Sequence, residues 1–122
     1  MNLDLNGMTI TRRQRQGAVR AITQGLNRLN EHGWCQGSYG NIHRGYCAIG
    51  AVGSGSGYTD SVVTNLLCAG IRKVTPSARI SKGSSEGRIV GWNDRKGRTA
   101  SEVKRAFRHA IKIGENLKPV QE

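Results

Sequence analysis

Three stretches of the sequence place apolar residues at helical spacing, and this period constrains the fold more than any other feature. In residues 11–31, Val19, Ile22 and Leu26 recur every three or four positions, which puts them on one face of a helix. Residues 60–74 and 100–117 repeat the pattern, with Asp60 as an N-cap and a capping box at 99–102. The sequence therefore predicts a mainly α fold, a compact helical domain with three main helices.

The remaining segments predict smaller elements around these helices. Residues 46–52 are apolar and suit either a short helix or a buried strand. Residues 78–92 favour a small β-hairpin, because 87–92 are strand-like and 78–81 can pair with them. We expect residues 1–10 and 119–122 to be flexible tails on a single globular domain of residues 11–118. A domain of this size buries enough surface to fold without a disulfide or a metal.

The apolar runs and the cysteines indicate a compartment. The longest apolar run, residues 47–52, is far shorter than the roughly 20 residues that cross a bilayer. Residues 1–7 have neither the basic nor the apolar region of a secretory signal. The three cysteines are an odd number without a Cys-x-x-Cys pair, which is typical of reduced thiols. We expect a cytoplasmic protein with no membrane partner.

Four potential zinc ligands lie within sixteen residues. His32, Cys35, His43 and Cys47 have a spacing that a tetrahedral site tolerates if a turn near 37–40 brings the two pairs together. The alternative is a pair of surface histidines and small buried thiols, since cysteine is among the most buried residue types. We favour this second interpretation and expect no metal, no cofactor and no disulfide, with Cys47 and Cys68 largely buried.

The sequence offers little for catalysis. A nucleophilic Cys35 or Cys47 would need a nearby base such as His43 or His109, and no local protease signature accompanies them. The eight acidic residues supply no convincing carboxylate pair. The Gly-Ser repeat at 53–57 lacks the lysine of a P-loop and the spacing of a dinucleotide loop. We therefore expect that the protein is not an enzyme, and a small cysteine enzyme stays the least favoured alternative.

Positive charge is the strongest functional signal. The chain has 19 Lys and Arg against 8 Asp and Glu, a net charge of +11, whereas about 2–8 suffices to keep a small domain soluble. Twelve of these cations and only three acids lie in residues 72–112. Some recur every four residues on the last helix, and others precede its N-terminus, where the helix dipole favours anions. The candidate nucleic-acid-binding residues are Arg95, Lys96, Arg98, Lys104, Arg105, Arg108 and Lys112.

This charge predicts a small basic accessory protein that binds a polyanion, above all nucleic acid, without sequence preference. The few aromatic residues lie outside the basic helix or are expected to be packed, so contacts to phosphates should dominate over contacts to bases. The alternative is a protein-interaction module that docks on an acidic host protein and modulates it. DNA, RNA and protein remain open as partners, as does the oligomeric state.

Four short motifs, in a fixed order, give the chain a resemblance to a family of small bacterial and bacteriophage proteins of unknown function. They frame most of residues 15–115, whereas the N-terminal tail, the basic stretch 72–88 and His43 lie outside the pattern. The motifs are Gly-Trp-Cys-Gln-Gly at 33–37, Cys-Ala-Ile-Gly-Ala at 47–51, Trp-Asn-Asp at 92–94 and Gly-Arg-Thr-Ala-Ser-Glu-Val at 97–103.

The resemblance implies a compact, mainly helical domain and no particular activity. It implies a phage origin, and hence action in the cytoplasm of the host cell. It also implies that Trp34, Cys47 and Trp92 are core or corner residues. Asp94 would then accept hydrogen bonds from backbone amides in the turn before Thr99.

Overall fold

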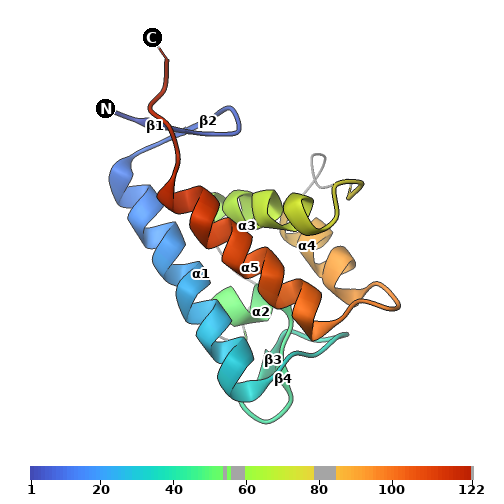
Figure 1. The fold of residues 1–122 in the computed structure, drawn as a ribbon. Coiled ribbons are helices and arrows are strands. Elements are labelled where there is room, and N and C mark those ends of the chain that lie inside the picture. The colour runs from blue at the N-terminus through green and yellow to red at the C-terminus, as the bar shows by residue number, and fades with distance from the viewer. Residues whose placement is uncertain (54, 56–59, 79–84, 122) are drawn as a thin grey trace.

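The structure, a computed structural model, describes residues 1–53, 55, 60–78 and 85–121. It confirms a mainly helical fold (Figure 1). In chain order the elements are β1 (Leu3–Leu5), β2 (Met8–Ile10), α1 (Arg12–His32), β3 (Gly40–Asn41), β4 (Gly45–Tyr46), α2 (Ala48–Gly53), α3 (Ser61–Val74), α4 (Ser85–Asp94) and α5 (Ala100–Glu115).

The three main helices begin where side chains cap them. Thr11 and Gln14 form a capping box at the start of α1, and Thr99 and Glu102 form another at the start of α5. The Asp60 carboxylate accepts the Val62 N–H at 2.7 Å at the start of α3. Each bond satisfies an amide that has no partner inside its helix. The predicted helices at 11–31, 60–74 and 100–117 are confirmed to within two residues.

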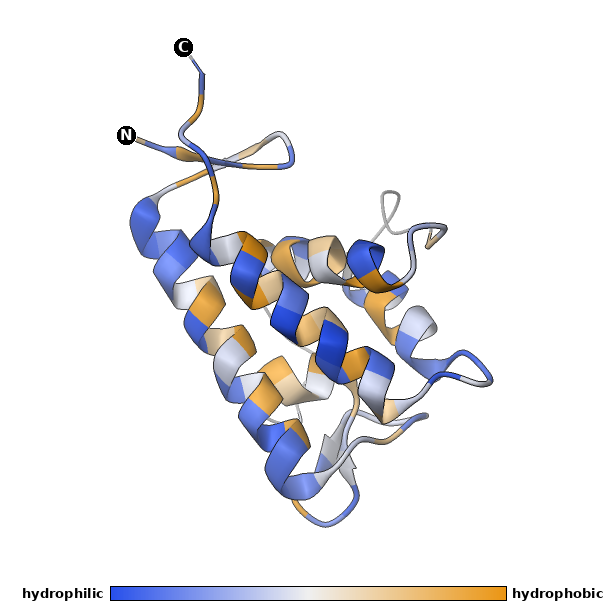
Figure 2. Cartoon of the chain, in the orientation of Figure 1, coloured by the Kyte–Doolittle hydropathy of each residue, from blue (hydrophilic) through white to orange (hydrophobic). Residues whose placement is uncertain are grey.

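Close backbone contact holds the main helices together. In Figure 1, α5 crosses the front of the molecule between α1 and α3, and it packs against both. Small residues permit this approach: a Cβ atom on Gly70 of α3 would lie 2.8 Å from the Ala110 Cβ of α5. Phe107 of α5 is fully buried in the core with Ile22 of α1. Figure 2 shows that hydrophilic residues follow the outer sides of α1 and α5.

Residues 1–10 differ from the expected flexible tail, because they form an antiparallel hairpin. Asn6 and Gly7 both have positive φ, at 50° and 92°, and make the two-residue turn that joins β1 to β2. Leu3, Leu5 and Ile10 are each only 2% exposed and belong to the core. Burial of these three apolar side chains is the physical reason why the segment is ordered.

The C-terminal segment also pairs with this hairpin. The Val120 N–H donates to the Asn2 carbonyl at 3.0 Å, and the Asp4 N–H donates to the Lys118 carbonyl at 2.9 Å. The two ends of the chain therefore lie side by side (Figure 1). Residues 119–121 of the expected C-terminal tail are thus partly held by backbone hydrogen bonds, and residue 122 lies outside the described residues.

The β-hairpin predicted at 78–92 is wrong where the structure describes it. Residues 85–94 form α4, and residues 79–84 lie outside the described residues. Ile89 and Trp92 are three positions apart and both buried, which is the spacing of one helix face. A second short hairpin instead joins β3 to β4, and residues 48–53 form the short helix α2. In the described part of the chain, no helix is long and apolar enough to span a membrane.

Candidate functional site

Four of the predicted cations form an open surface on α5. We call Lys104, Arg105, Arg108 and Lys112 the α5 basic face. Arg105, Arg108 and Lys112 are exposed and Lys104 is half-buried, whereas the opposite side of α5 is buried in the core. From Lys104 to Lys112 the helix rises about 12 Å. The structure describes two ion pairs among its placed residues, and neither involves the α5 basic face.

The turn between α4 and α5 adds two further cations. Arg95 and Lys96 are both exposed there, just before the N-terminus of α5. The Arg98 N–H donates to the Arg95 carbonyl at 3.0 Å, and Gly97 takes a φ of 88°, which a side chain would disfavour. The structure therefore places Arg95 and Lys96 next to the beginning of the helix that carries the α5 basic face.

Arg98 does not join this surface, although the sequence predicts that it does. Its side chain is only 8% exposed, and its guanidinium carbon lies 4.2 Å from the centroid of the Trp92 ring. The Nε atom donates to the Trp92 carbonyl at 2.9 Å, and Nη1 donates to the Glu102 carboxylate at 3.1 Å. Arg98 thus ties the end of α4 to the first turn of α5.

The Glu102 carboxylate stabilises the same turn. The Thr99 N–H donates to Glu102 Oε1 at 2.9 Å, and this bond is the main cause that lowers the pKa of Glu102 below its ordinary value. The Thr99 hydroxyl and Arg98 lower that pKa further. Glu102 is therefore held in its charged form at the helix N-terminus, where negative charge is favoured.

Asn93 connects three of the four motif segments, and it is fully buried. Its side-chain oxygen accepts the Trp34 indole N–H at 2.7 Å and the Ala48 N–H at 2.9 Å. Its side-chain nitrogen donates to the Cys35 carbonyl at 3.1 Å and to Asp94 Oδ1 at 2.9 Å. One amide side chain thereby joins the end of α4 to the 33–37 loop and to the start of α2.

Asp94 and Gln36 complete this junction. The resemblance implied that Asp94 binds amides in the turn before Thr99, but its carboxylate instead accepts the Gly37 N–H at 3.1 Å. The turn satisfies amides with backbone carbonyls, so Asp94 is turned toward the 33–37 loop. Gln36 donates to the carbonyls of Asn93 and Arg95, each at 3.0 Å, and so satisfies the end of α4.

The corner residues lie where the resemblance implied. Cys47 and Trp92 are buried, and Trp34 is half-buried against Asn93. Trp92 donates its indole N–H to the Thr75 hydroxyl at 3.1 Å. These side chains make the interior of the junction and do not belong to an exposed binding surface.

Two of the three cysteines are buried. Cys47 and Cys68 are buried, as predicted, and Cys35 is half-buried. Burial raises the pKa of the Cys47 thiol, whose Sγ accepts the Gly50 N–H at 3.3 Å. Neither Cys35 nor Cys47 is hydrogen-bonded to a histidine within the described part of the chain. His109 is exposed on α5.

The four potential zinc ligands are spread over several elements. His32 ends α1 and pairs with Glu31, and His43 is exposed in the turn between β3 and β4. Cys35 Sγ is directed to the Gly45 carbonyl at 3.5 Å. Among the residues that the structure describes, no group of three or more His, Cys, Asp or Glu side chains is placed to hold a metal ion.

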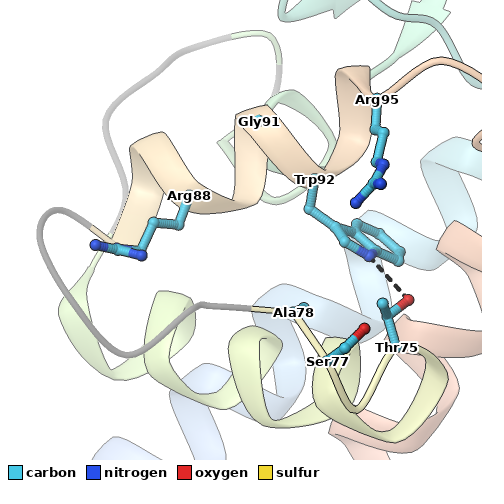
Figure 3. Close-up of a pocket in the computed structure, with 7 residues that line it drawn as sticks. All are labelled: Thr75, Ser77, Ala78, Arg88, Gly91, Trp92 and Arg95. Carbon is cyan, nitrogen blue, oxygen red and sulfur yellow. Dashed lines mark hydrogen bonds between the residues drawn. The ribbon is translucent and has the colours of Figure 1, made fainter.

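A pocket beside α4 adds Arg88 to the basic residues that the sequence predicts for the site. Arg88 of α4 and Arg95 of the turn after α4 line it together with Thr75 and Ser77 of the turn after α3 (Figure 3). Arg88 lies on α4, and Arg95 directly follows its last residue. A helix at 85–94 places Arg88 beside the pocket, whereas the strand that the sequence predicts at 87–92 gives no such placement.

The fold and the exposed cations define a small, mainly helical domain with a basic outer surface. Residues 13–113 match DUF6197, a family of unknown function, and the chain belongs to this family. The resemblance to a family without a known activity is thereby confirmed. No match was found among the curated proteins or among the solved structures.

Proposed function

We propose that the protein binds nucleic acid through its phosphates, without sequence preference, by means of the α5 basic face together with Arg95 and Lys96. The observation that carries this proposal is a row of four cations along one side of α5, of which three are exposed and Lys104 is half-buried. They take part in neither of the ion pairs found in the described residues. Exposed cations in a row bind phosphates by releasing the counterions that surround nucleic acid.

The distribution of aromatic side chains supports binding without sequence preference. The one aromatic residue of α5, Phe107, is fully buried, and Trp92 is buried beside Thr75. Tyr39 is 41% exposed but lies beside Glu86, to which its hydroxyl donates at 3.4 Å. The α5 basic face therefore offers cations to phosphates and no aromatic platform on which bases could stack.

The test is a charge-removal variant with a matched control. The binding variant combines Lys104→Ala, Arg108→Ala and Lys112→Ala. The control removes the same charge elsewhere, by Arg12→Ala, Arg13→Ala and Arg44→Ala, which are all exposed. Fluorescence anisotropy is recorded with a mixed-sequence duplex and a mixed-sequence single strand between about 50 and 200 mM salt.

We expect the parent protein to lose affinity steeply as salt rises. Each phosphate neutralised adds about 0.9 to the log–log slope for duplex DNA, so the binding variant should lose roughly 2–3 units of slope. The control should lose clearly less, and unrelated sequences should respond alike. If the binding variant behaves as the parent does, or if the parent binds neither DNA nor RNA at low salt, the proposal is wrong. An acidic protein surface would then become the favoured partner.

The proposed mode of action is binding without catalysis. In support, burial raises the pKa of the Cys47 thiol, which disfavours the reactive thiolate. The proposed location is the cytoplasm, of the host cell if a bacteriophage encodes the protein, because three cysteines without a Cys-x-x-Cys pair suit a reducing compartment. Fractionation of cells that express the full chain tests this location, and recovery of the chain outside the cytoplasmic fraction would refute it.

A further inference from the structure

The pocket in Figure 3 lies between α4 and the turn that follows α3, and no residue of α5 lines it among those that the structure describes. Its volume is about 370 Å³, within the range of sites that hold small ligands. Trp92 forms its floor, with the indole N–H bonded to the Thr75 hydroxyl. The pocket is thus shaped by the buried core of α4 and α3 and by the turn at 75–78.

Two arginines stand at the ends of this pocket. Arg88 lies on α4, and Arg95 directly follows Asp94, the last residue of α4. Figure 3 shows the Arg95 side chain directed toward the Trp92 ring, whereas the Arg88 side chain extends toward the first turn of α4. Gly91 lies between them in the sequence and also lines the pocket, and a Cβ atom there would meet nothing within 4 Å. The missing side chain at Gly91 therefore keeps the space between the arginines open.

The hydroxyl groups of Thr75 and Ser77 can donate hydrogen bonds into the pocket. Thr75 accepts the Trp92 indole N–H, so the hydrogen of its own hydroxyl remains for another acceptor. Ser77 is exposed and supplies a second hydroxyl. None of the described residues that line the pocket carries a carboxylate. The lining is therefore rich in donors and positively charged, which suits an anion whose oxygens only accept hydrogen bonds.

We propose that this pocket binds the phosphate group of a nucleotide or of the phosphorylated end of a nucleic-acid strand. Arginine suits a phosphate oxyanion because its planar guanidinium donates two parallel hydrogen bonds. Arg95 contacts the phosphate together with Thr75 and Ser77, and Arg88 adds positive charge at the far end. The edge of Trp92 gives the sugar or base an apolar wall. The pocket shares Arg95 with the proposed nucleic-acid surface but contains no residue of the α5 basic face.

Two variants of the full chain separate the pocket from the rest of the surface. Gly91→Leu fills the open space without removing charge, and its φ lies in a range that side chains adopt. Its matched control is Gly17→Leu, another helical glycine whose Cβ would meet nothing within 4 Å. Arg95→Gln removes one cation of the pocket, and Arg44→Gln removes one cation elsewhere. Circular dichroism checks that each variant is folded.

The first probe set contains adenosine monophosphate, adenosine and inorganic phosphate, and binding is measured by calorimetry. We expect adenosine monophosphate to bind the parent at least about tenfold more tightly than adenosine, which corresponds to about 1.4 kcal/mol. Gly91→Leu and Arg95→Gln should abolish that preference, and the two controls should keep it. Equal binding of the nucleotide and the nucleoside, or a preference that survives Gly91→Leu, would overturn the inference.

The second probe set contains a short single strand with either a 5′-phosphate or a 5′-hydroxyl group. A tighter complex with the phosphorylated strand, lost in Gly91→Leu, assigns the strand end as a source of the phosphate. A preference for the free nucleotide alone supports the pocket with a nucleotide as its ligand. The two proposals fail separately: if no strand binds but the nucleotide does, the proposed nucleic-acid function falls and the pocket stands. If strands bind but no phosphate preference exists, only the pocket falls.

Discussion

Asn93→Ala should be among the most destabilising substitutions in the protein, although Asn93 is a polar residue. The side chain is fully buried, and it makes hydrogen bonds to Trp34, Ala48 and Cys35. Alanine would leave two N–H donors and one carbonyl without a partner at the junction of α4, α2 and the 33–37 loop. The three bonds reach two other segments of the chain, the 33–37 loop and the start of α2.

The loss of unfolding free energy in Asn93→Ala depends on how deeply each group that loses its hydrogen-bond partner is buried. An unsatisfied buried donor or acceptor costs about 1–3 kcal/mol. Ala48 is fully buried, so its N–H cannot reach water, whereas Trp34 and Cys35 are half-buried and water offsets part of their loss. A total of about 3–5 kcal/mol is expected, a large share of the roughly 5–15 kcal/mol that stabilises a typical domain.

Urea unfolding followed by circular dichroism measures this cost. We expect the midpoint to fall by about 2 M, while the exposed Asn30→Ala control should stay close to the parent. Asn93→Asp is a sharper probe, since it keeps the acceptor but loses the donated bonds and places a second carboxylate beside Asp94. Its stability should rise, relative to the parent, as the pH falls and the acid is protonated. A cost below about 1 kcal/mol for Asn93→Ala would refute the reasoning.

Three further predictions follow from packing and charge. Gly70→Ala should cost about 1–3 kcal/mol in denaturant unfolding because its Cβ would press on the backbone of α5, whereas Gly17→Ala has open space and should be neutral or stabilising. Because the folded-state pKa of Glu102 is lowered, its stabilising contribution is present above its ordinary value of 4.5 and is lost as pH falls through the lowered pKa. Glu102→Gln should therefore be less stable than the parent at pH 7 but nearly equal at pH 2–3, as measured by urea midpoints. In the native protein, mass spectrometry should find that iodoacetamide modifies Cys47 much more slowly than the half-buried Cys35.

The main helices could be predicted because their signals are local. An apolar period, an N-cap and a following glycine lie within one helix length, as with Thr11 and Gly33 around α1. The hairpin of residues 1–10 was also predictable, since Asn6-Gly7 between alternating apolar residues is a strong turn signal.

Helix α4 could not be predicted in the same way. Gly87 and Gly91 interrupt the segment and disfavour a helix, and Ile89 and Trp92 are too few to show a clear period. Packing decides the outcome, because a helix buries both of these side chains against the core and brings Asn93 to the 33–37 loop. Tertiary contacts of this kind are not visible in a local window of sequence.

The exposed cations could be predicted from the sequence on α5, where the helical period separates the exposed side from the buried side. Outside the helix no such period exists. Lys104, Arg108 and Lys112 lie opposite the buried side of α5, and their period shows this. Arg98 lies two residues before the helix, where no period applies, and its ring and carbonyl contacts with Trp92 are made across the turn. The contacts that a charged side chain makes across a turn therefore determine whether it is exposed or packed inside the fold.

Membership of the family and the proposed binding activity concern different parts of the molecule. Three of the motif segments contribute Trp34, Ala48 and Asn93 to one buried junction, and the fourth supplies Arg98 and the α5 capping box. These contacts determine how α4 meets α5 and hence where the exposed cations lie. A substitution in the junction should therefore lower stability and binding together. A substitution in the α5 basic face should lower binding alone, so only the surface variants can establish what the protein binds.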